Sequence, residues 1–108
     1  KDLFSKLLDK FISEAKKRGH IPIIIIFPQL IDLKLKNTNL HYRNFFKSFE
    51  KKLNIIDLTS AFEKKNLEKM FINDKYGGHL SKSGNDYIAK IINLKLNRII
   101  KELNAKNL

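Results

Sequence analysis

The chain has no cysteine and no tryptophan, and only four of its 108 residues are glycine and two are proline. Without cysteine it can form no disulfide, no thiolate zinc site and no thiol nucleophile. The longest apolar run, residues 23–27, is far too short to cross a bilayer, so we expect no transmembrane segment. Three scattered histidines lack zinc-site spacing, and neither a P-loop nor a dinucleotide fingerprint occurs. We therefore expect no metal and no organic cofactor.

The charge is strongly one-sided, with a formal net charge of +11. Lysine and arginine occur in every segment, mostly between the apolar positions of helical patterns, as on solvated helix faces. No groove-reading or RNA-binding motif accompanies this charge, so we expect no specific nucleic-acid partner. A basic, non-catalytic binding module remains an alternative. The sequence does not distinguish a cytoplasmic protein from one of the cell envelope.

The spacing of apolar residues predicts helices over residues 2–18, from 42 to 53, from 60 to about 69, and from 81 onward. Gly19 follows a Lys-Lys-Arg turn and should end the first helix. Three phenylalanines at helical spacing (Phe45, Phe46 and Phe49) should belong to the core. Ser60 and Glu63 have capping-box spacing, and Ser81 is a good N-cap. His20 and His41 then stand at helix ends, as capping or surface residues.

Two segments predict strands, at residues 21–27 and 54–58. The first contains an unbroken β-branched and aromatic run, residues 23–27, which is typical of a central strand covered on both faces of a parallel sheet. Strands that alternate with helices favour such a sheet with helices on both sides. A sheet of only two strands is marginally stable, so residues 1–108 are expected to be a single domain fragment whose N-terminal half is missing. Residues 29–40 remain unassigned, and 73–80 are expected to form a loop.

The segment from Asp74 to Ala89, DKYGGHLSKSGNDYIA, carries the best candidate for chemistry. Gly77 and Gly78 allow tight backbone turns just before His79, and the positive end of the helix capped by Ser81 follows closely. Asp74 could fold back to accept the Nδ1 proton of His79, leaving Nε2 free to take a proton from a nucleophile. The alternative is an ordinary surface or capping histidine.

The stretch GGHLSKSGNDYIAKII resembles the final conserved block of the SGNH (GDSL-type) hydrolases. The resemblance implies the C-terminal half of a three-layer α/β/α, flavodoxin-like parallel sheet, with His79 as general base and Asp74 as its orienting acid. In the family the acid normally stands three residues before the histidine, a position that is Tyr76 here, whereas Asp74 stands five before it. Asp57 is the second choice for the acid. Its alternative role is hydrogen bonding at the end of the second strand.

The family's nucleophilic serine block and its oxyanion donors do not occur in this sequence. No serine of the chain sits in a strand-to-helix nucleophile turn; the serines are Ser5, Ser13, Ser48, Ser60, Ser81 and Ser83. The resemblance thus implies a serine-dependent hydrolase acting on a small-molecule or carbohydrate ester, with this chain supplying only the His/Asp part of the triad. Alone, the chain is expected to be inactive. An O-acyltransferase of the same superfamily acting on sugars is the alternative enzyme.

Overall fold

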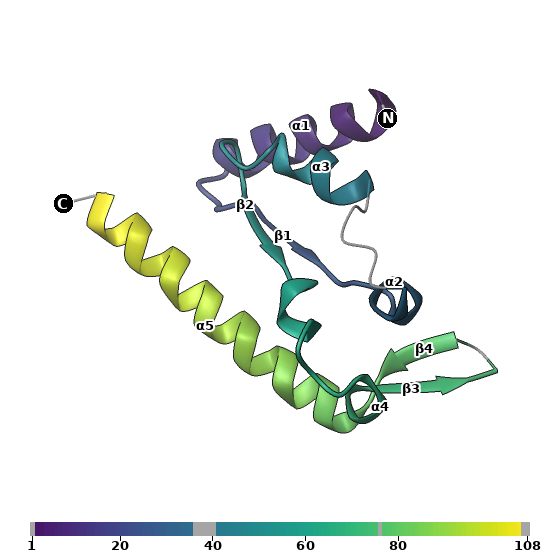
Figure 1. Ribbon diagram of the computed structural model, residues 1–108. Helices are drawn as coiled ribbons and strands as arrows, with labels where there is room; N and C mark the ends of the chain where they lie inside the picture. Colours follow the sequence, from purple (N-terminus) through teal and green to yellow (C-terminus); the bar gives the residue numbers. More distant parts are fainter. Residues whose placement is uncertain (1, 36–40, 76, 107–108) are drawn as a thin grey trace. The chain divides into compact units, whose positions relative to one another are not determined.

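The computed structural model describes residues 2–35, 41–75 and 77–106. In chain order the elements are α1 (Asp2–Lys17), β1 (Ile23–Ile26), α2 (Leu30–Lys34), α3 (His41–Lys47), β2 (Asn54–Asp57), the 3-10 helix η1 (Ser60–Phe62), α4 (Leu67–Met70), β3 (Phe71–Asp74), β4 (Gly77–Leu80) and α5 (Lys82–Lys106) (Figure 1). They form two compact units, residues 1–25 with 40–55 and residues 26–39 with 56–108. Within the described ranges, no helix combines the length and hydrophobicity needed to cross a membrane.

The first unit is built on the amphipathic helix α1 and the phenylalanines of α3. Its buried core consists of Leu8, Ile12, Phe49 and Leu53. Phe45 and Phe46 pack against this core with their ring centroids 5.3 Å apart, in an edge-to-face arrangement. Such a pair adds to the stability that burial alone supplies. The predicted phenylalanine core is therefore confirmed.

Helix α1 ends as the sequence predicts. Gly19 adopts a positive φ of 70°. The Gly19 N–H donates to the Lys16 carbonyl at 3.1 Å, and the His20 N–H donates to the Ala15 carbonyl at 2.8 Å. This pair of bonds is a Schellman motif, in which glycine supplies the left-handed residue. His20 is exposed and lies just beyond the helix, so it belongs to the capping segment.

The sheet corrects the predicted fold class. Strands β1 and β2 form a two-stranded parallel sheet, and β3 and β4 form a separate antiparallel one. The Asn54 N–H donates to the Pro22 carbonyl at 3.3 Å, and the Leu58 N–H donates to the Ile26 carbonyl at 3.0 Å. Within the described ranges, no third strand joins β1 and β2. The prediction of a three-layer α/β/α flavodoxin-like sheet is therefore wrong.

The predicted central strand shows why. Strand β1 has four residues, and of these only Ile26 is buried, while the other three isoleucines remain partly accessible. Phe27, the last residue of the apolar run, is 53% exposed. An unbroken apolar run indicates that both faces could be buried, but it does not supply the neighbouring strands and helices that would cover them.

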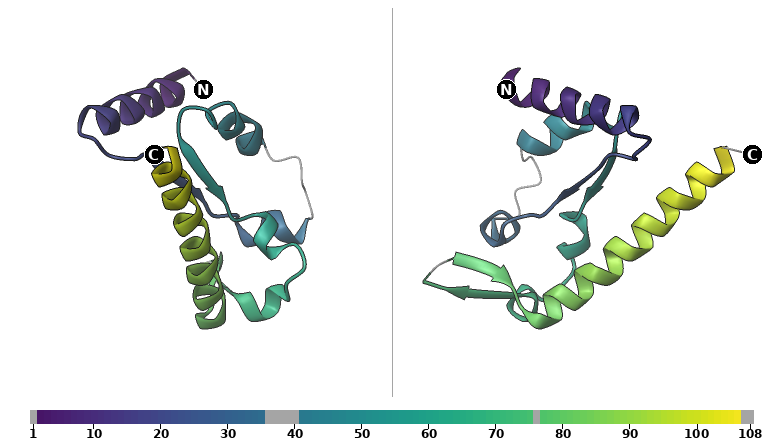
Figure 2. Two further views of the ribbon diagram at one scale, coloured as in Figure 1. Left: turned by 90° about the vertical axis from the view of Figure 1, so that its left-hand side faces the viewer. Right: turned by 180° about the vertical axis from the view of Figure 1, so that it is seen from behind.

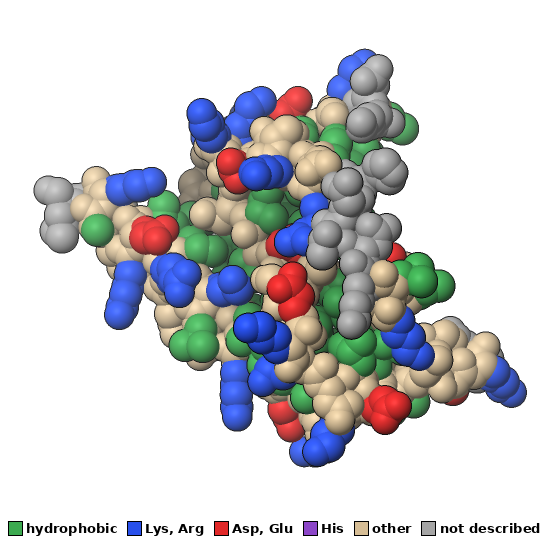
Figure 3. Space-filling model, viewed as in Figure 1, with side chains coloured by type: hydrophobic (Ala, Val, Ile, Leu, Met, Phe, Trp, Pro, Cys, Tyr) green, Lys and Arg blue, Asp and Glu red, His purple; other side chains and the backbone are tan. Residues whose placement is uncertain are grey.

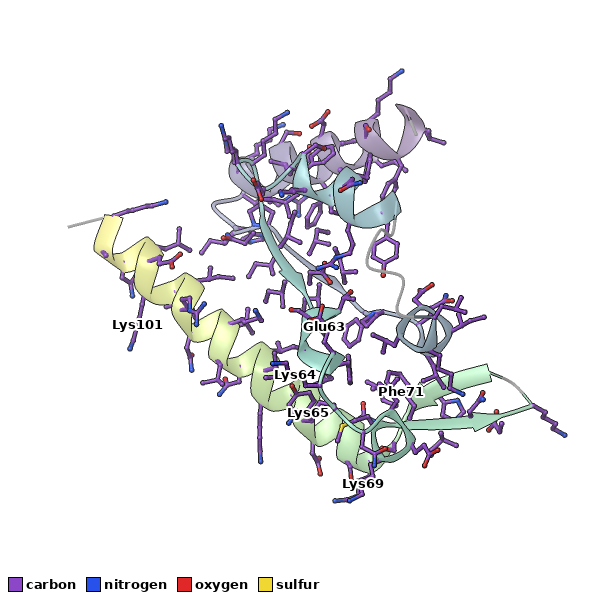
Figure 4. All side chains as sticks on the ribbon, viewed as in Figure 1. Glu63, Lys64, Lys65, Lys69, Phe71 and Lys101 are labelled. Atoms are coloured by element: carbon purple, nitrogen blue, oxygen red, sulfur yellow. The ribbon has the colours of Figure 1, made fainter. Side chains whose placement is uncertain are left out.

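The second unit has its own core beneath the β3–β4 hairpin. The rings of Phe62 and Phe71 lie 5.2 Å apart, and Tyr87 of α5 packs edge-on against Phe62 at 6.0 Å. The Tyr87 hydroxyl donates to the Ala61 carbonyl at 2.5 Å, which ties α5 to the η1 segment. Phe71 lies at the base of the hairpin (Figure 4). These contacts fix the start of α5 against the segment that leads into β3.

Several predicted helix bounds are corrected. The helix expected from residue 60 to about 69 is split into η1 and α4, because the backbone turns between them. No side-chain cap forms at the start of η1, whereas the Asn66 side chain accepts from the Glu68 N–H at 3.0 Å and caps α4. Helix α3 ends at Lys47 instead of Leu53, and α2 occupies part of the unassigned segment.

Candidate active site on the β3–β4 hairpin

The segment expected to be a loop is an antiparallel hairpin. Its register pairs Phe71 with Leu80, Ile72 with His79, Asn73 with Gly78 and Asp74 with Gly77. Because side chains alternate along a strand, the hairpin has two distinct faces. The outer face carries Ile72, Asp74, Gly77 and His79, and the inner face carries Phe71, Asn73, Gly78 and Leu80. In the views of Figures 1 and 2, the hairpin extends from α4 and the N-terminal end of α5.

The outer face brings the two predicted site residues together. His79 Nε2 lies 3.6 Å from Asp74 Oδ2. They are diagonal neighbours across the two strands, a relation that allows long side chains to meet. Gly77, the direct partner of Asp74, has no side chain to intervene. The five-residue spacing between Asp74 and His79 therefore allows their side chains to meet on one face of the hairpin. Tyr76, at the family's usual position for the acid, lies outside the described residues.

The geometry of the pair is loose. A separation of 3.6 Å exceeds hydrogen-bond length, and the side chains of His79 and Asp74 are 53% and 43% exposed. An ion pair so open to solvent adds little to stability. The nitrogen that faces Asp74 is Nε2, whereas the sequence analysis expected Nδ1. A half-turn of the ring about its Cβ–Cγ bond would place Cε1, not Nδ1, where Nε2 now lies, so Nε2 is the nitrogen that this position of the ring offers to Asp74. The catalytic roles of both residues remain predictions.

The joint between β4 and α5 explains two other residues of the motif. The Ser81 hydroxyl donates to the Lys69 carbonyl and accepts from the Gly84 N–H, the latter at 3.1 Å. The predicted N-cap is therefore confirmed. A Cβ on Gly84 would lie 2.0 Å from the Met70 carbonyl oxygen, so only glycine fits there. Sequence analysis missed this role, although a glycine inside a helical pattern was its signal.

The remaining sequence candidates have structural roles. Asp57 Oδ1 accepts from the Thr59 N–H at 3.0 Å, which is the strand-end bond offered as its alternative role. The hydroxyls of Ser13 and Ser48 donate to backbone carbonyls three residues earlier. Within residues 2–35, 41–75 and 77–106, no group of three or more His, Cys, Asp or Glu side chains could hold a metal ion.

A groove of about 590 Å³ lies between α2 and the hairpin. We call it the α2–hairpin groove; it is lined by Gln29, Leu30, Ile31, Lys34, Asn73, Gly77 and Gly78. A Cβ on Gly78 would lie 2.6 Å from Leu30 Cβ, so α2 packs closely against the inner face. Asn73 and Gly78 belong to the inner face, whereas His79 and Asp74 belong to the outer one. The sequence analysis did not anticipate this groove.

Comparisons with protein-family models, with curated proteins and with solved structures found no match. The chemistry open to the site follows from the His79 imidazole and the Asp74 carboxylate. An imidazole beside a carboxylate can accept and return a proton, and the carboxylate can orient the ring and stabilise its protonated form. Since the pair is exposed, a reacting group can reach it from the outer side of the hairpin.

Proposed function

We propose that this chain carries the histidine base and the acid of a serine-dependent ester hydrolase of the SGNH type. The observation that supports this most directly is the approach of His79 to Asp74 on one face of the hairpin, at 3.6 Å. The motif DKYGGHLSKSGN places both residues just before a capped helix. None of the six serines of the sequence stands in a strand-to-helix nucleophile turn, so the proposal requires a serine other than these.

The chemistry assigned to each residue follows from general acid–base catalysis. The ring nitrogen of His79 that does not face Asp74 takes the proton of the serine hydroxyl as the serine oxygen attacks the ester carbonyl carbon. The imidazolium then gives this proton to the departing alcohol, leaving an acyl-serine. Water attacks the acyl-serine by the same route, so the acid is released and the serine recovers its proton. Asp74 stabilises the imidazolium in both halves.

The test is labelling of the complete protein by a fluorophosphonate probe, which reacts only with an activated serine. His79→Ala should abolish labelling, and Asp74→Asn should reduce it without abolishing it, since the base remains. His20→Ala is the matched control, because His20 is an exposed histidine in the other compact unit and should not affect labelling. Equal labelling of the wild type and His79→Ala would contradict the assignment.

The products separate hydrolysis from the sugar O-acyltransferase. With an acetyl ester and an added sugar, a hydrolase releases acetic acid at a rate that does not depend on the sugar. A transferase instead forms the acetylated sugar. Loss of both products in His79→Ala supports the role of the base in either case.

A further inference from the structure

We propose that the α2–hairpin groove is a second binding site, and that it takes a sugar bearing a carboxylate. The site is distinct from the proposed catalytic pair, because Asn73, the hairpin side chain that lines the groove, belongs to the inner face, whereas the side chains of Asp74 and His79 belong to the outer face and do not line the groove. Its volume of about 590 Å³ falls in the range of small-molecule sites and accommodates a monosaccharide.

The polar lining suits sugar hydroxyls. Gln29 and Asn73 each contribute an amide, one from the turn before α2 and the other from β3. An amide both donates and accepts hydrogen bonds, as do the hydroxyl groups of a sugar ring. Two amides on opposite walls can therefore hold a ring by its hydroxyls from both sides.

The apolar lining suits the C–H face of a sugar ring. Leu30 is buried against the hairpin, whereas Ile31 is 60% exposed and offers aliphatic surface. Gly77 and Gly78 present backbone without side chains, so a ligand can approach the hairpin closely. A fatty chain would use Leu30 and Ile31 but would leave both amides of the groove without partners.

The charge of the groove selects an anion. Among the described residues that line the groove, Lys34 has the one charged side chain. No described carboxylate forms an ion pair with Lys34. A hydrogen bond from an ammonium to a carboxylate is stronger than one between neutral groups. A carboxylate on the sugar therefore complements Lys34, while the neutral sugar lacks this contact.

The experiment is a titration of the protein followed by NMR or calorimetry, at constant ionic strength, with D-galacturonate, D-galactose and acetate. Galactose has the same hydroxyl configuration as galacturonate and differs in having CH2OH in place of the carboxylate. We expect galacturonate to bind about tenfold more tightly than galactose, as expected for one charge-assisted hydrogen bond. Acetate should bind more weakly than either sugar, because it leaves both amides unused.

Variants separate the groove from its surroundings. Lys34→Gln should lower the affinity for galacturonate about tenfold, to the value for galactose. Lys90→Gln makes the same charge change at an exposed position of α5 and should alter neither affinity. Asn73→Ala should weaken both sugars several-fold, because it removes an amide that both use.

Four results would overturn the proposal: no binding of galacturonate, acetate binding as tightly as galacturonate, equal effects of Lys34→Gln and Lys90→Gln, or loss of binding in His79→Ala. The last would join the groove to the catalytic pair. Because the titration needs no serine and no turnover, failure of the ester-hydrolase proposal leaves its result unchanged.

Discussion

The Ser81 side chain forms hydrogen bonds to the backbone of two separate helices, α4 and α5. Its hydroxyl donates to the Lys69 carbonyl and accepts from the Gly84 N–H. Its own N–H donates to the Met70 carbonyl at 2.9 Å. One serine therefore caps α5 and ties the helix to the end of α4. A serine in the interior of a helix caps nothing, because its hydroxyl can only bond to a backbone carbonyl of its own helix.

We expect Ser81→Ala to lower the free energy of unfolding by about 1 kcal/mol, the usual cost of removing an N-cap. Ser13→Ala is the matched control. Ser13 lies inside α1, and its hydroxyl donates only to the Lys10 carbonyl of the same helix, so alanine should change stability by less than about 0.5 kcal/mol. Urea unfolding followed by circular dichroism measures both values. Equal effects of the two substitutions would show that the Ser81 cap contributes nothing.

At the scale of elements, the joint between the hairpin, α4 and α5 depends on close backbone approach. Gly84 is buried in the first turn of α5. A Cβ there would meet the Met70 carbonyl oxygen at 2.0 Å, its carbon at 3.0 Å and Leu80 Cδ2 at 3.1 Å. A backbone carbonyl cannot move as a flexible side chain can, so α5 itself would have to shift.

Gly84→Ala therefore tests the joint. In an ordinary helix interior this substitution stabilises by about 1 kcal/mol. Here we expect the opposite sign, a loss of at least about 2 kcal/mol in the free energy of unfolding, because overpacking against backbone outweighs the propensity gain. Asn85→Ala, the next residue and exposed, should be neutral or slightly stabilising. Denaturant unfolding measures the free energy of unfolding of both variants. A Gly84→Ala protein as stable as the wild type would refute the close approach of α5 to the Met70 carbonyl.

Some of the helices and strands could be predicted from the sequence, and others could not. Helix α1 begins and ends near its predicted residues, and α5 begins near its predicted residue, because long apolar periodicity and strong caps act locally. The hairpin was missed because Asn73, Asp74, Gly77 and Gly78 are poor strand formers, and their pairing comes from tertiary context. The sequence analysis proposed Asp74 as the partner of His79, and the hairpin lays the two side chains on one face. Which ring nitrogen faces the acid depends on the hairpin's register and twist, which spacing alone does not give.

At the scale of the whole molecule, the charge of +11 and the exposed apolar side chains act against each other. Lysine and arginine side chains are dispersed over the face drawn in Figure 3, and the lysines labelled in Figure 4 lie in the turn before α4, in α4 and in α5. A dispersed positive charge repels other copies of the chain and keeps it in solution. Large apolar side chains remain exposed on α1, among them Leu3 at 71% and Leu7 at 55%. Such surface favours association once the repulsion is screened.

We therefore expect self-association to increase with salt. Between ~0.01 M and ~0.5 M salt the screening length falls several-fold, which removes the repulsion between copies but leaves apolar contacts intact. The double variant Leu3→Ala/Leu7→Ala should reduce this association without loss of stability, as measured by sedimentation velocity and urea unfolding. Leu8 is only 5% exposed and lies in the core of the first unit, so Leu8→Ala should instead cost about 2–5 kcal/mol. If association fell as salt rose, attraction between charges would be its cause, and the α1 leucines would have no part in it.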